Sequence, residues 1–338
     1  MPIRARAPSR IDLAGGTLDL WPIYLLIDEA ATVNLAIDLY TEVSIAPSAD
    51  GRFRVRERSS GRERSADSPE GLFPLEGAEI AGRLLRFFSP REPLELVTHS
   101  QAPPQAGLGA SSSLGISIAG ALNGLTGFRY RDLDLIAIVK DVEVEVLRAM
   151  TGAQDHYPPV YGGAACLWWD KLHHRREPLE VDREAFERRF LLAYSHQPHR
   201  SGATNWEVVK RFLEGDARTR RALEKSGRTA VGIRNALVAG DLDSAARLMG
   251  EDWQARREMA PAVSSPELEA IIDAAREAGA VAAKVCGAGG GGCIVVALPD
   301  GPEKKRSAIE GAIRGAGGSI LDYHLVDRGL ELLVDEAG

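Results

Sequence analysis

The sequence predicts a two-domain protein of the α+β class, and three observations support this. Short apolar runs separated by turns fill the first hundred residues, which is the pattern of β-strands. Between Thr204 and Gly279 the apolar spacing is almost wholly helical, with breaks near Gly215, Gly240 and Pro261. The length of 338 residues corresponds to two ordinary domains or one large one.

The first half of the chain is expected to contain strands before helices. Five strands are predicted before residue 100, over 11–14, 32–37, 41–45, 53–56 and 94–98. The polar, turn-rich stretch 61–71 predicts a loop. Apolar residues recur at helical spacing from Ser111 to Gly127 and again over about 131–150, and 162–169 is predicted as a strand.

The second half is expected to begin after a polar linker. We place the domain boundary in the stretch 171–184, which contains Pro178, and so divide the chain into residues 1–178 and 179–338. After the helical region the pattern predicts a tail of alternating elements. The strands of this half are predicted over 190–194, 281–285, 293–298, 319–325 and 330–334, with one helix over 303–315.

The overall charge argues against one class of partner. A formal net charge of -7 gives no reason to expect a nucleic-acid-binding surface. Six arginines gather in the stretch 52–64, but two glutamates and several serines dilute them. We therefore interpret this stretch as an exposed strand and loop.

The cysteines and the N-terminus indicate the compartment. Cys166, Cys286 and Cys293 are an odd number without C-x-x-C spacing, so neither a disulfide framework nor a zinc site is expected. We expect Cys286 and Cys293 to be buried thiols. The N-terminus lacks the apolar core of a signal peptide, and no run approaches the ~18 apolar residues of a membrane helix. A soluble cytoplasmic protein without membrane contact is expected.

The strongest functional signal is the segment 103–113, with the sequence PPQAGLGASSS, between a predicted strand and a predicted helix. Its glycines allow the backbone to approach an anion, and the start of the helix offers unpaired N–H groups and a partial positive charge. Serine hydroxyls can bind phosphate oxygens or complete the shell of a magnesium ion. The G-x-x-x-x-G-K-[ST] spacing is absent. The segment predicts a phosphate site, with a flexible serine-capped loop as the alternative.

Two further glycine turns are candidate parts of the same site. The segment 6–19 ends a predicted strand in Gly15 and Gly16, followed by Asp19. A carboxylate on such a turn can accept hydrogen bonds from two sugar hydroxyls, although it can equally cap the next segment. The run 287–292 holds five glycines in six residues between two predicted strands. It either packs against a ligand-bearing loop or turns tightly.

The segment 151–157, with the sequence TGAQDHY, offers a general base. The carboxylate of Asp155 can act on a hydroxyl, and His156 is a second candidate base, although a histidine beside an aspartate is more often structural. The preceding predicted helix carries Glu143 and Glu145. Residues two apart on a helix point to nearly opposite sides, so only one of these two can face the site.

Taken in this order, the four segments resemble those of the GHMP kinase superfamily of sugar, mevalonate and homoserine kinases. The likeness extends from Arg6 to about Leu298. The segment 103–113 resembles the family's P-x-x-x-G-L-G-[AS]-S-S phosphate loop, and the run 287–292 resembles its third motif. The A-G-G-T-x-D form of the first motif, followed by a proline and a tyrosine, looks most like bacterial D-glycero-D-manno-heptose 7-phosphate kinases and fucokinase-like sugar kinases.

The resemblance implies a fold and an activity. It implies an N-terminal mixed α/β domain with the phosphate loop and a C-terminal ferredoxin-like domain with extra helices. The implied enzyme is an ATP-dependent phosphotransferase that uses ATP and Mg²⁺ to phosphorylate a sugar or sugar-phosphate hydroxyl, with the anomeric hydroxyl expected. A monomer or homodimer with a small-molecule substrate is expected.

The resemblance also implies roles for single residues. Asp155 falls on the catalytic base, and Arg10 falls on the residue that stabilises charge near the transferred phosphoryl group. Ser111 and Glu143 fall on the magnesium ligands, with Glu145 as the runner-up. The implied ATP-binding residues are Pro103, Ala106, Gly107, Leu108, Gly109, Ala110, Ser111, Ser112 and Ser113. The implied substrate-binding residues are Gly15, Gly16, Thr17, Asp19, Gly289 and Gly290.

One segment departs from the family pattern. The stretch 194–202 (YSHQPHRSG) carries two histidines where the heptose and fucose enzymes have a threonine- or glycine-rich turn. His196, His199 and Arg200 can bind a phosphate that the substrate already carries. They can equally form a polar turn at the domain boundary.

Two other functions remain open at this stage. The first is a GHMP kinase for a non-sugar alcohol such as mevalonate or homoserine, against which Asp19 and Arg10 speak. The second is a non-catalytic ligand sensor with the same fold. Such proteins usually lose a motif, whereas Arg10, Ser111 and Asp155 are all present.

Overall fold

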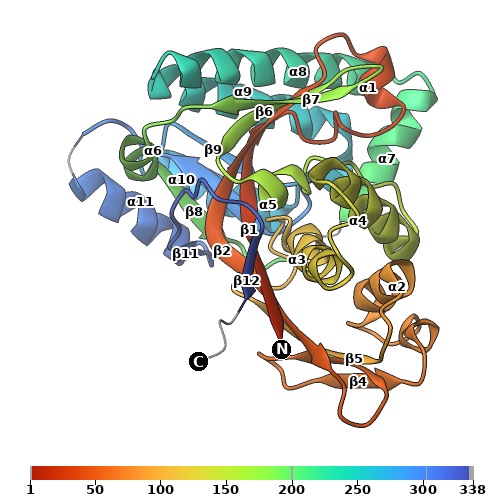
Figure 1. Ribbon diagram of the computed structural model, residues 1–338. Coiled ribbons are helices and arrows are strands. Elements are labelled where there is room, and N and C mark those ends of the chain that lie inside the picture. The colour runs from red at the N-terminus through yellow and green to blue at the C-terminus, as the bar shows by residue number, and fades with distance from the viewer. Residues whose placement is uncertain (1, 199–200, 302, 335–338) are drawn as a thin grey trace.

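The computed structural model describes residues 2–198, 201–301 and 303–334, which fold around two β-sheets (Figure 1). In the larger sheet the strand order is β12-β1-β2-β5-β3-β4, and β6 and β7 extend it from β2. In the smaller sheet the order is β11-β8-β10-β9, with antiparallel pairing throughout. The strands of the larger sheet are β1 (Ile3–Ala14), β2 (Ala31–Pro47), β3 (Phe53–Glu57), β4 (Glu63–Ala66), β5 (Leu94–Ser100), β6 (Ala164–Trp169), β7 (His174–Leu179) and β12 (Glu331–Val334). Those of the smaller sheet are β8 (Phe190–Tyr194), β9 (Ala282–Val285), β10 (Cys293–Ala297) and β11 (Ser319–Leu321).

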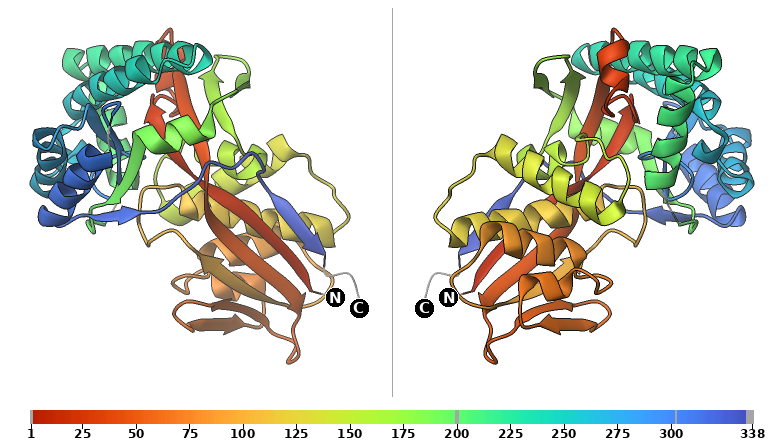
Figure 2. Two further views of the ribbon diagram at one scale, coloured as in Figure 1. Left: turned by 90° about the vertical axis from the view of Figure 1, so that its left-hand side faces the viewer. Right: turned by 90° about the vertical axis from the view of Figure 1, so that its right-hand side faces the viewer.

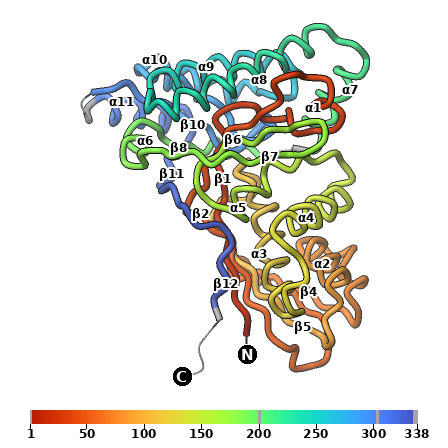
Figure 3. The backbone as a smooth tube through the Cα atoms, turned by 45° about the horizontal axis from the view of Figure 1, so that its top comes forward, coloured from red at the N-terminus to blue at the C-terminus, as the bar shows by residue number. Residues whose placement is uncertain are grey.

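Helices cover both sheets. Figure 3 shows α8 and α9 side by side in one layer, and α3 beside the strands β1 and β2. The helices are α1 (Ile23–Leu26), α2 (Glu79–Phe88), α3 (Ala110–Leu125), α4 (Asp132–Leu147), α5 (Tyr157–Tyr161), α6 (Arg183–Arg189), α7 (Ser201–Leu213), α8 (Ala217–Val238), α9 (Leu242–Met259), α10 (Pro266–Glu277) and α11 (Glu303–Gly315), with short 3₁₀ helices at Pro69–Leu72 and Pro261–Val263. Within the described ranges, no helix combines the length and apolarity needed to span a membrane.

The helix α3 forms the centre of the first half. Its apolar residues from Ile116 to Leu122 are buried, and the helix packs against β1, β2, α2 and α4. The hydroxyl of Ser113 donates to the carbonyl of Ala7 and lies 2.7 Å from the hydroxyl of Thr41. These hydrogen bonds satisfy polar groups that would otherwise be costly in the core. They also fix the start of α3 against the first two strands.

Most predicted elements are present, with several corrections. The strands expected at 32–37 and 41–45 are one long strand, β2, because a bulge opposite Pro8 bends it without interrupting the pairing with β1. The loop expected at 61–71 contains β4 and a 3₁₀ helix that Ser68 caps. The strand expected over 319–325 ends at Leu321.

The polar linker expected at 171–184 is also partly structured. The strand β7 pairs with β6 alone, and its Pro178 is tolerated because an edge strand needs no second set of hydrogen bonds. Edge exposure also explains why this strand is polar, a composition that by itself predicts a linker.

The last described strand lies beside the first one. The strand β12 pairs with β1 in antiparallel register, with Ile3 opposite Val334. Figure 2 shows this last, blue strand beside the red first strand in both views. The larger sheet therefore draws on both halves of the chain.

A buried ion pair joins the two sheets. The ammonium of Lys284 on β9 donates to a carboxylate oxygen of Asp12 on β1 at 2.5 Å, and both side chains are fully buried. Burial alone would raise the pKa of Asp12, but Lys284, Arg10 and Arg256 lower it to about 2. Asp12 is therefore ionised at neutral pH, and its charge needs a buried partner.

Replacing Lys284 with methionine should destabilise the protein. The substitution K284M leaves the charge of Asp12 buried with fewer cations, and breaking such a pair typically costs about 3–5 kcal/mol. Urea unfolding measures the change. The matched control is K210M, because Lys210 pairs with Glu214 on the surface, where ion pairs contribute little. Equal stabilities for K284M and K210M would contradict this account.

Candidate active site

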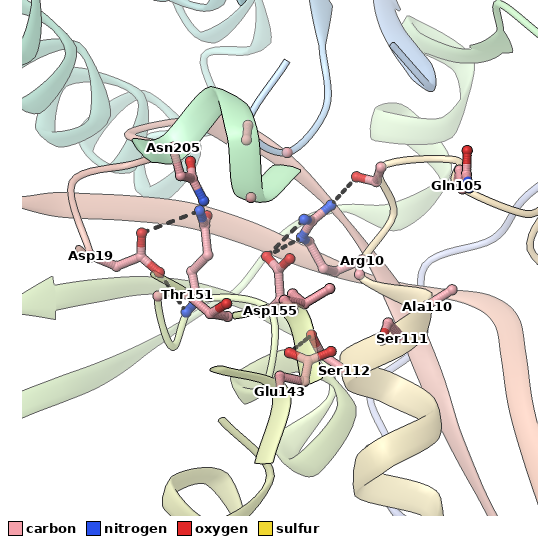
Figure 4. Close-up of a pocket in the computed structure, with 18 of the residues that line it drawn as sticks. Arg10, Asp19, Gln105, Ala110, Ser111, Ser112, Glu143, Thr151, Asp155 and Asn205 are labelled. Atoms are coloured by element: carbon pink, nitrogen blue, oxygen red, sulfur yellow. Dashed lines mark hydrogen bonds and ion pairs between the residues drawn. The ribbon is translucent and has the colours of Figure 1, made fainter. Parts of the chain in front are cut away.

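A cavity of about 390 Å³ lies where the sequence motifs converge (Figure 4). Its wall combines the loop before α3, two residues of α4, the segment before α5, the start of α7 and the loop after β9. Arg10 reaches it from β1, and Asp19 reaches it from the turn that follows this strand. Segments that are far apart in the sequence therefore share one site.

The loop before α3 presents backbone groups to the cavity. Gly107 and Gly109 both have positive φ, 69° and 68°, and Gly109 is the N-cap of α3 without a side-chain hydrogen bond. The first N–H groups of a helix have no partner within it, and here Ala110, Ser111 and Ser112 line the cavity. The predicted residues Ala106, Gly107 and Gly109 also line it. This end of the cavity therefore suits an anion.

Three residues that were predicted to bind ATP do not line the cavity. Leu108 is buried, and its carbonyl accepts a hydrogen bond from the backbone N–H of Arg10. Ser113 is buried and is bonded to β1 and β2. Pro103 lies outside the cavity wall. The first two anchor the loop instead, because their polar groups point into the protein.

A buried arginine connects the loop to a carboxylate. The Nε and Nη2 atoms of Arg10 donate to the same oxygen, Oδ1, of Asp155 at 2.9 and 2.7 Å, and Nη1 donates to the carbonyl of Gly107 at 2.6 Å. Burial would lower the pKa of Arg10, but Asp155 and Asp12 raise it above its usual value. Arg10 is 1% exposed, whereas the Asp155 side chain is 29% exposed. The pair therefore offers a fixed cation beside a carboxylate that a ligand can reach.

Asp19 lies in the same cavity but in a different environment. Its Oδ2 accepts a hydrogen bond from the backbone N–H of Gln154 at 2.9 Å. A Cβ atom on Gly152 would lie 1.7 Å from Oδ2, so only glycine at this position allows the close approach. Burial raises the pKa of Asp19 to about 6, and the nearby Asp155 adds to this.

A third carboxylate, that of Glu143, lies beneath the start of α3. Oε2 of Glu143 accepts a hydrogen bond from the hydroxyl of Ser112 at 2.8 Å, and Nε2 of the buried His156 lies 3.0 Å from the same oxygen. Burial would raise the pKa of Glu143, but His156, Ser111 and Ser112 lower it. Glu145 instead points outward and pairs with Arg83.

This acidic group fits a magnesium ion bound together with a phosphate. Among the described residues, no cluster of three or more His, Cys, Asp or Glu side chains could hold a metal by itself. Magnesium commonly uses one or two carboxylates together with water and phosphate oxygens. An ionised Glu143 beside the hydroxyls at the helix start meets that requirement.

Several predicted substrate residues lie outside the cavity wall. Gly289 and Gly290 pack against the 3₁₀ helix at Pro261–Val263, and Gly287 and Ala288 line the cavity in their place. His196 is exposed and its ring contacts Tyr194.

The remaining predicted substrate-binding residues, apart from Asp19, either lie behind the cavity wall or fall outside the residues that the structure describes. Gly15, Gly16 and Thr17 are buried in the turn that carries Asp19. Arg200, like His199, falls outside the described residues.

The cavity also contains residues that sequence reasoning missed. Gln154 holds Asp19, and Asn205 on α7 faces the same space, as Figure 4 shows. Gln154 could have been noticed from its place beside Asp155. Asn205 belongs to an ordinary helical pattern and carried no signal.

Comparison with known proteins identifies the family of this chain. Two family models match the chain, that of the GHMP kinase N-terminal domain over residues 78–163 and that of the GHMP kinase C-terminal region over residues 233–319. Together they match about half of the chain. The chain therefore belongs to the GHMP kinases, and the resemblance inferred from the motifs is confirmed.

Relatives are found among sugar kinases. The D-glycero-alpha-D-manno-heptose 7-phosphate kinase of Campylobacter jejuni is 26% identical over 97% of this chain and 98% of its own length. The galactokinase of Thermotoga neapolitana is 23% identical over 96% and 98%. A D-glycero-D-manno-heptose 1-phosphate kinase structure from Bacteroides thetaiotaomicron superposes with a TM-score of 0.78 at 21% identity, over 99% of this chain and all of that one. The likeness in structure confirms the predicted two-part fold.

The carboxyl group of Asp19 should titrate near pH 6. Burial disfavours the ionised form, so the group stays protonated below about pH 6 and is a pure hydrogen-bond acceptor above it. Carboxyl carbon NMR across pH 4 to 8 measures the midpoint, and the D19N variant, which lacks the resonance, assigns it. A midpoint near 4, the value of a solvated aspartate, would show that burial does not control this group.

Proposed function

We propose that this GHMP kinase is an ATP-dependent sugar kinase that transfers the γ-phosphoryl group to a hydroxyl of a sugar or sugar phosphate, the anomeric hydroxyl being the expected acceptor. The observation that carries the proposal is the Arg10–Asp155 pair at the start of α3. It brings an anion site, a fixed cation and an accessible carboxylate into one cavity. Phosphoryl transfer needs chiefly positioning and charge stabilisation, which these groups supply.

The start of α3, Arg10 and Asp155 each have a separate role in the proposed reaction. The N–H groups at the start of α3 bind the triphosphate, and Arg10 stabilises negative charge on the transferred group. The acceptor oxygen attacks the γ-phosphorus, the bond to the bridging β–γ oxygen breaks, and ADP leaves. Asp155 orients the hydroxyl and takes its proton. Oδ1 is held by Arg10, so Oδ2 is the oxygen that remains for the acceptor.

Two further carboxylates, those of Glu143 and Asp19, have proposed roles in binding the metal and the sugar. Ser111 and Glu143 would hold Mg²⁺, which when bound neutralises charge on the phosphate oxygens. Asp19, held on the opposite wall by Gln154, would accept hydrogen bonds from sugar hydroxyls. An acceptor with few hydroxyl groups would leave the lone pairs of this buried carboxylate that Gln154 does not use without a donor, which favours a sugar.

A second cavity supports a phosphorylated acceptor. It has a volume of about 550 Å³ and shares Gly202 and Ala203 with the first cavity. Its wall includes the exposed side chains of Arg148 and Trp206. An indole can pack against the C–H face of a sugar, and a guanidinium binds phosphate. We propose that Arg148 binds a phosphate on the far end of the acceptor, a role that the sequence had suggested for the turn at 194–202.

Replacing Asp155 with asparagine should abolish turnover. D155N keeps the shape of the side chain but removes the proton acceptor, so kcat should fall by about 10³-fold or more, with a modest effect on ATP binding. An ADP-release assay with a panel of sugars and sugar 7-phosphates measures turnover. The matched control is D141N, because Asp141 lies on the surface of α4. Unchanged kcat in D155N would refute the assignment, and normal ATP binding without turnover of any acceptor by the unaltered protein would favour a ligand sensor.

Replacing Arg148 with glutamine should discriminate between acceptors. Losing one charge-assisted contact should raise the KM of a sugar phosphate about 10- to 100-fold, while the KM of the matching unphosphorylated sugar stays the same. The control variant is R129Q, since Arg129 lies on the surface beyond α3. Equal effects on both acceptors would show that Arg148 does not bind the phosphate.

A further inference from the structure

Two charged side chains of α9 point between the glycine turns of the site. Asp252 and Arg256 lie four residues apart, on the same side of the helix, and both are fully buried. Neither lines the cavity. They lie instead behind its wall, where the turn after β1 meets the loop after β9.

The turn after β1 rests on both side chains. The backbone N–H of Gly15 donates to Oδ1 of Asp252 at 3.4 Å. A Cβ atom on Gly16 would lie 2.3 Å from Nη1 of Arg256, so the guanidinium lies directly against the backbone of this turn. The same turn leads to Asp19, the proposed sugar-binding carboxylate.

In the loop after β9, both backbone polar groups of Gly287 form hydrogen bonds with buried charged side chains. The carbonyl of Gly287 accepts a hydrogen bond from Nη2 of Arg256 at 2.8 Å. The N–H of Gly287 donates to Oδ1 of Asp12 at 2.6 Å. Gly287 itself lines the cavity. Its position therefore depends on two buried charges that belong to different elements.

The cluster extends to the proposed catalytic arginine. Lys284 binds Oδ2 of Asp12 and lies 3.9 Å from Oδ2 of Asp252. Oδ1 of Asp12 lies 3.9 Å from Nη1 of Arg10. The buried charges thus form a continuous chain from α9 to the Arg10–Asp155 pair.

The guanidinium of Arg256 is only partly paired. Its Nη2 donates to Gly287, whereas Nε and Nη1 have no hydrogen-bond partner among the described residues although they are buried. Its charge favours the ionised forms of the buried Asp12 and Asp252, so Arg256 also contributes to stability. What sets it apart from a purely structural charge is that one side chain contacts two turns of the site.

We propose that Arg256 is a positioning residue, which fixes the turn carrying Asp19 against Gly287 and so holds the acceptor in line with the phosphate. This role rests on the proposed function, because positioning an acceptor has meaning only if the protein phosphorylates one. The contacts themselves do not depend on the substrate.

Hydrogen exchange tests the contacts without any substrate. In R256M, exchange of the peptides that cover residues 13–19 and 286–292 should become at least tenfold faster, while a peptide from β5 stays unchanged. The control is R257M, because the neighbouring Arg257 points away from the site and pairs with Glu269. Unchanged exchange in both peptides, or an equal increase throughout the chain, would overturn the proposal.

Kinetics test the role. In R256M, kcat/KM for the acceptor should fall about 10- to 100-fold while the KM for ATP changes less than threefold, and R257M should match the unaltered enzyme. Equal losses for acceptor and ATP would indicate general damage and overturn the role. If the unaltered protein phosphorylates no sugar, the proposed function fails, and the exchange experiment still decides whether Arg256 fixes the two turns.

A milder variant covers the case in which R256M does not fold. R256K keeps the buried charge but lacks the planar fork that reaches Gly287 and Gly16 together. It should show faster exchange at residues 286–292 with a melting temperature close to that of the unaltered protein. Exchange at the original rate in R256K would overturn the proposal.

Discussion

The candidate site depends on one buried guanidinium. Arg10 binds the loop before α3 through Gly107 and the segment before α5 through Asp155. A cation without water must be paired, so these contacts are not optional, and the elements that supply them take a defined position around it. The distance between the anion site and the carboxylate follows from this pairing. Phosphoryl transfer, which requires alignment more than reactive groups, can use such a rigid arrangement.

The three carboxylates around this centre differ because their surroundings differ. Burial with few partners raises the pKa of Asp19, whereas His156 and two serines lower that of Glu143 despite its burial. Asp155 has a cation on one oxygen, and its side chain is 29% exposed. Side chains of nearly the same chemistry therefore meet different surroundings within one cavity, which the three proposed roles of sugar binding, metal binding and proton acceptance require.

Motif reasoning located part of the cavity wall where local backbone geometry is decisive. Glycines and a helix start form an anion site wherever they occur together, and the segment predicted on this ground contributes Ala106, Gly107, Gly109 and Ala110 to the wall. Motif reasoning was less successful with the run at 287–292, where the cavity is lined by Gly287 rather than Gly289. Which residue of a flexible loop faces a ligand depends on what packs behind it, here the 3₁₀ helix at Pro261–Val263. The charges of α9 carried no signal, since their spacing is that of any helix.

The sequence alone therefore determined the local chemistry of this protein. It specified a helix start of the kind that suits an anion, a glycine turn before Asp19 and membership in a kinase family. The resemblance favoured Glu143 over Glu145, and the tertiary structure places Glu143 in the cavity wall while Glu145 points outward. Only the tertiary structure decided that Arg10 pairs with Asp155, 145 residues further along the chain. The reason is physical. Backbone conformation depends on neighbouring residues, whereas a buried charge is defined by the distant groups that desolvate it and pair with it.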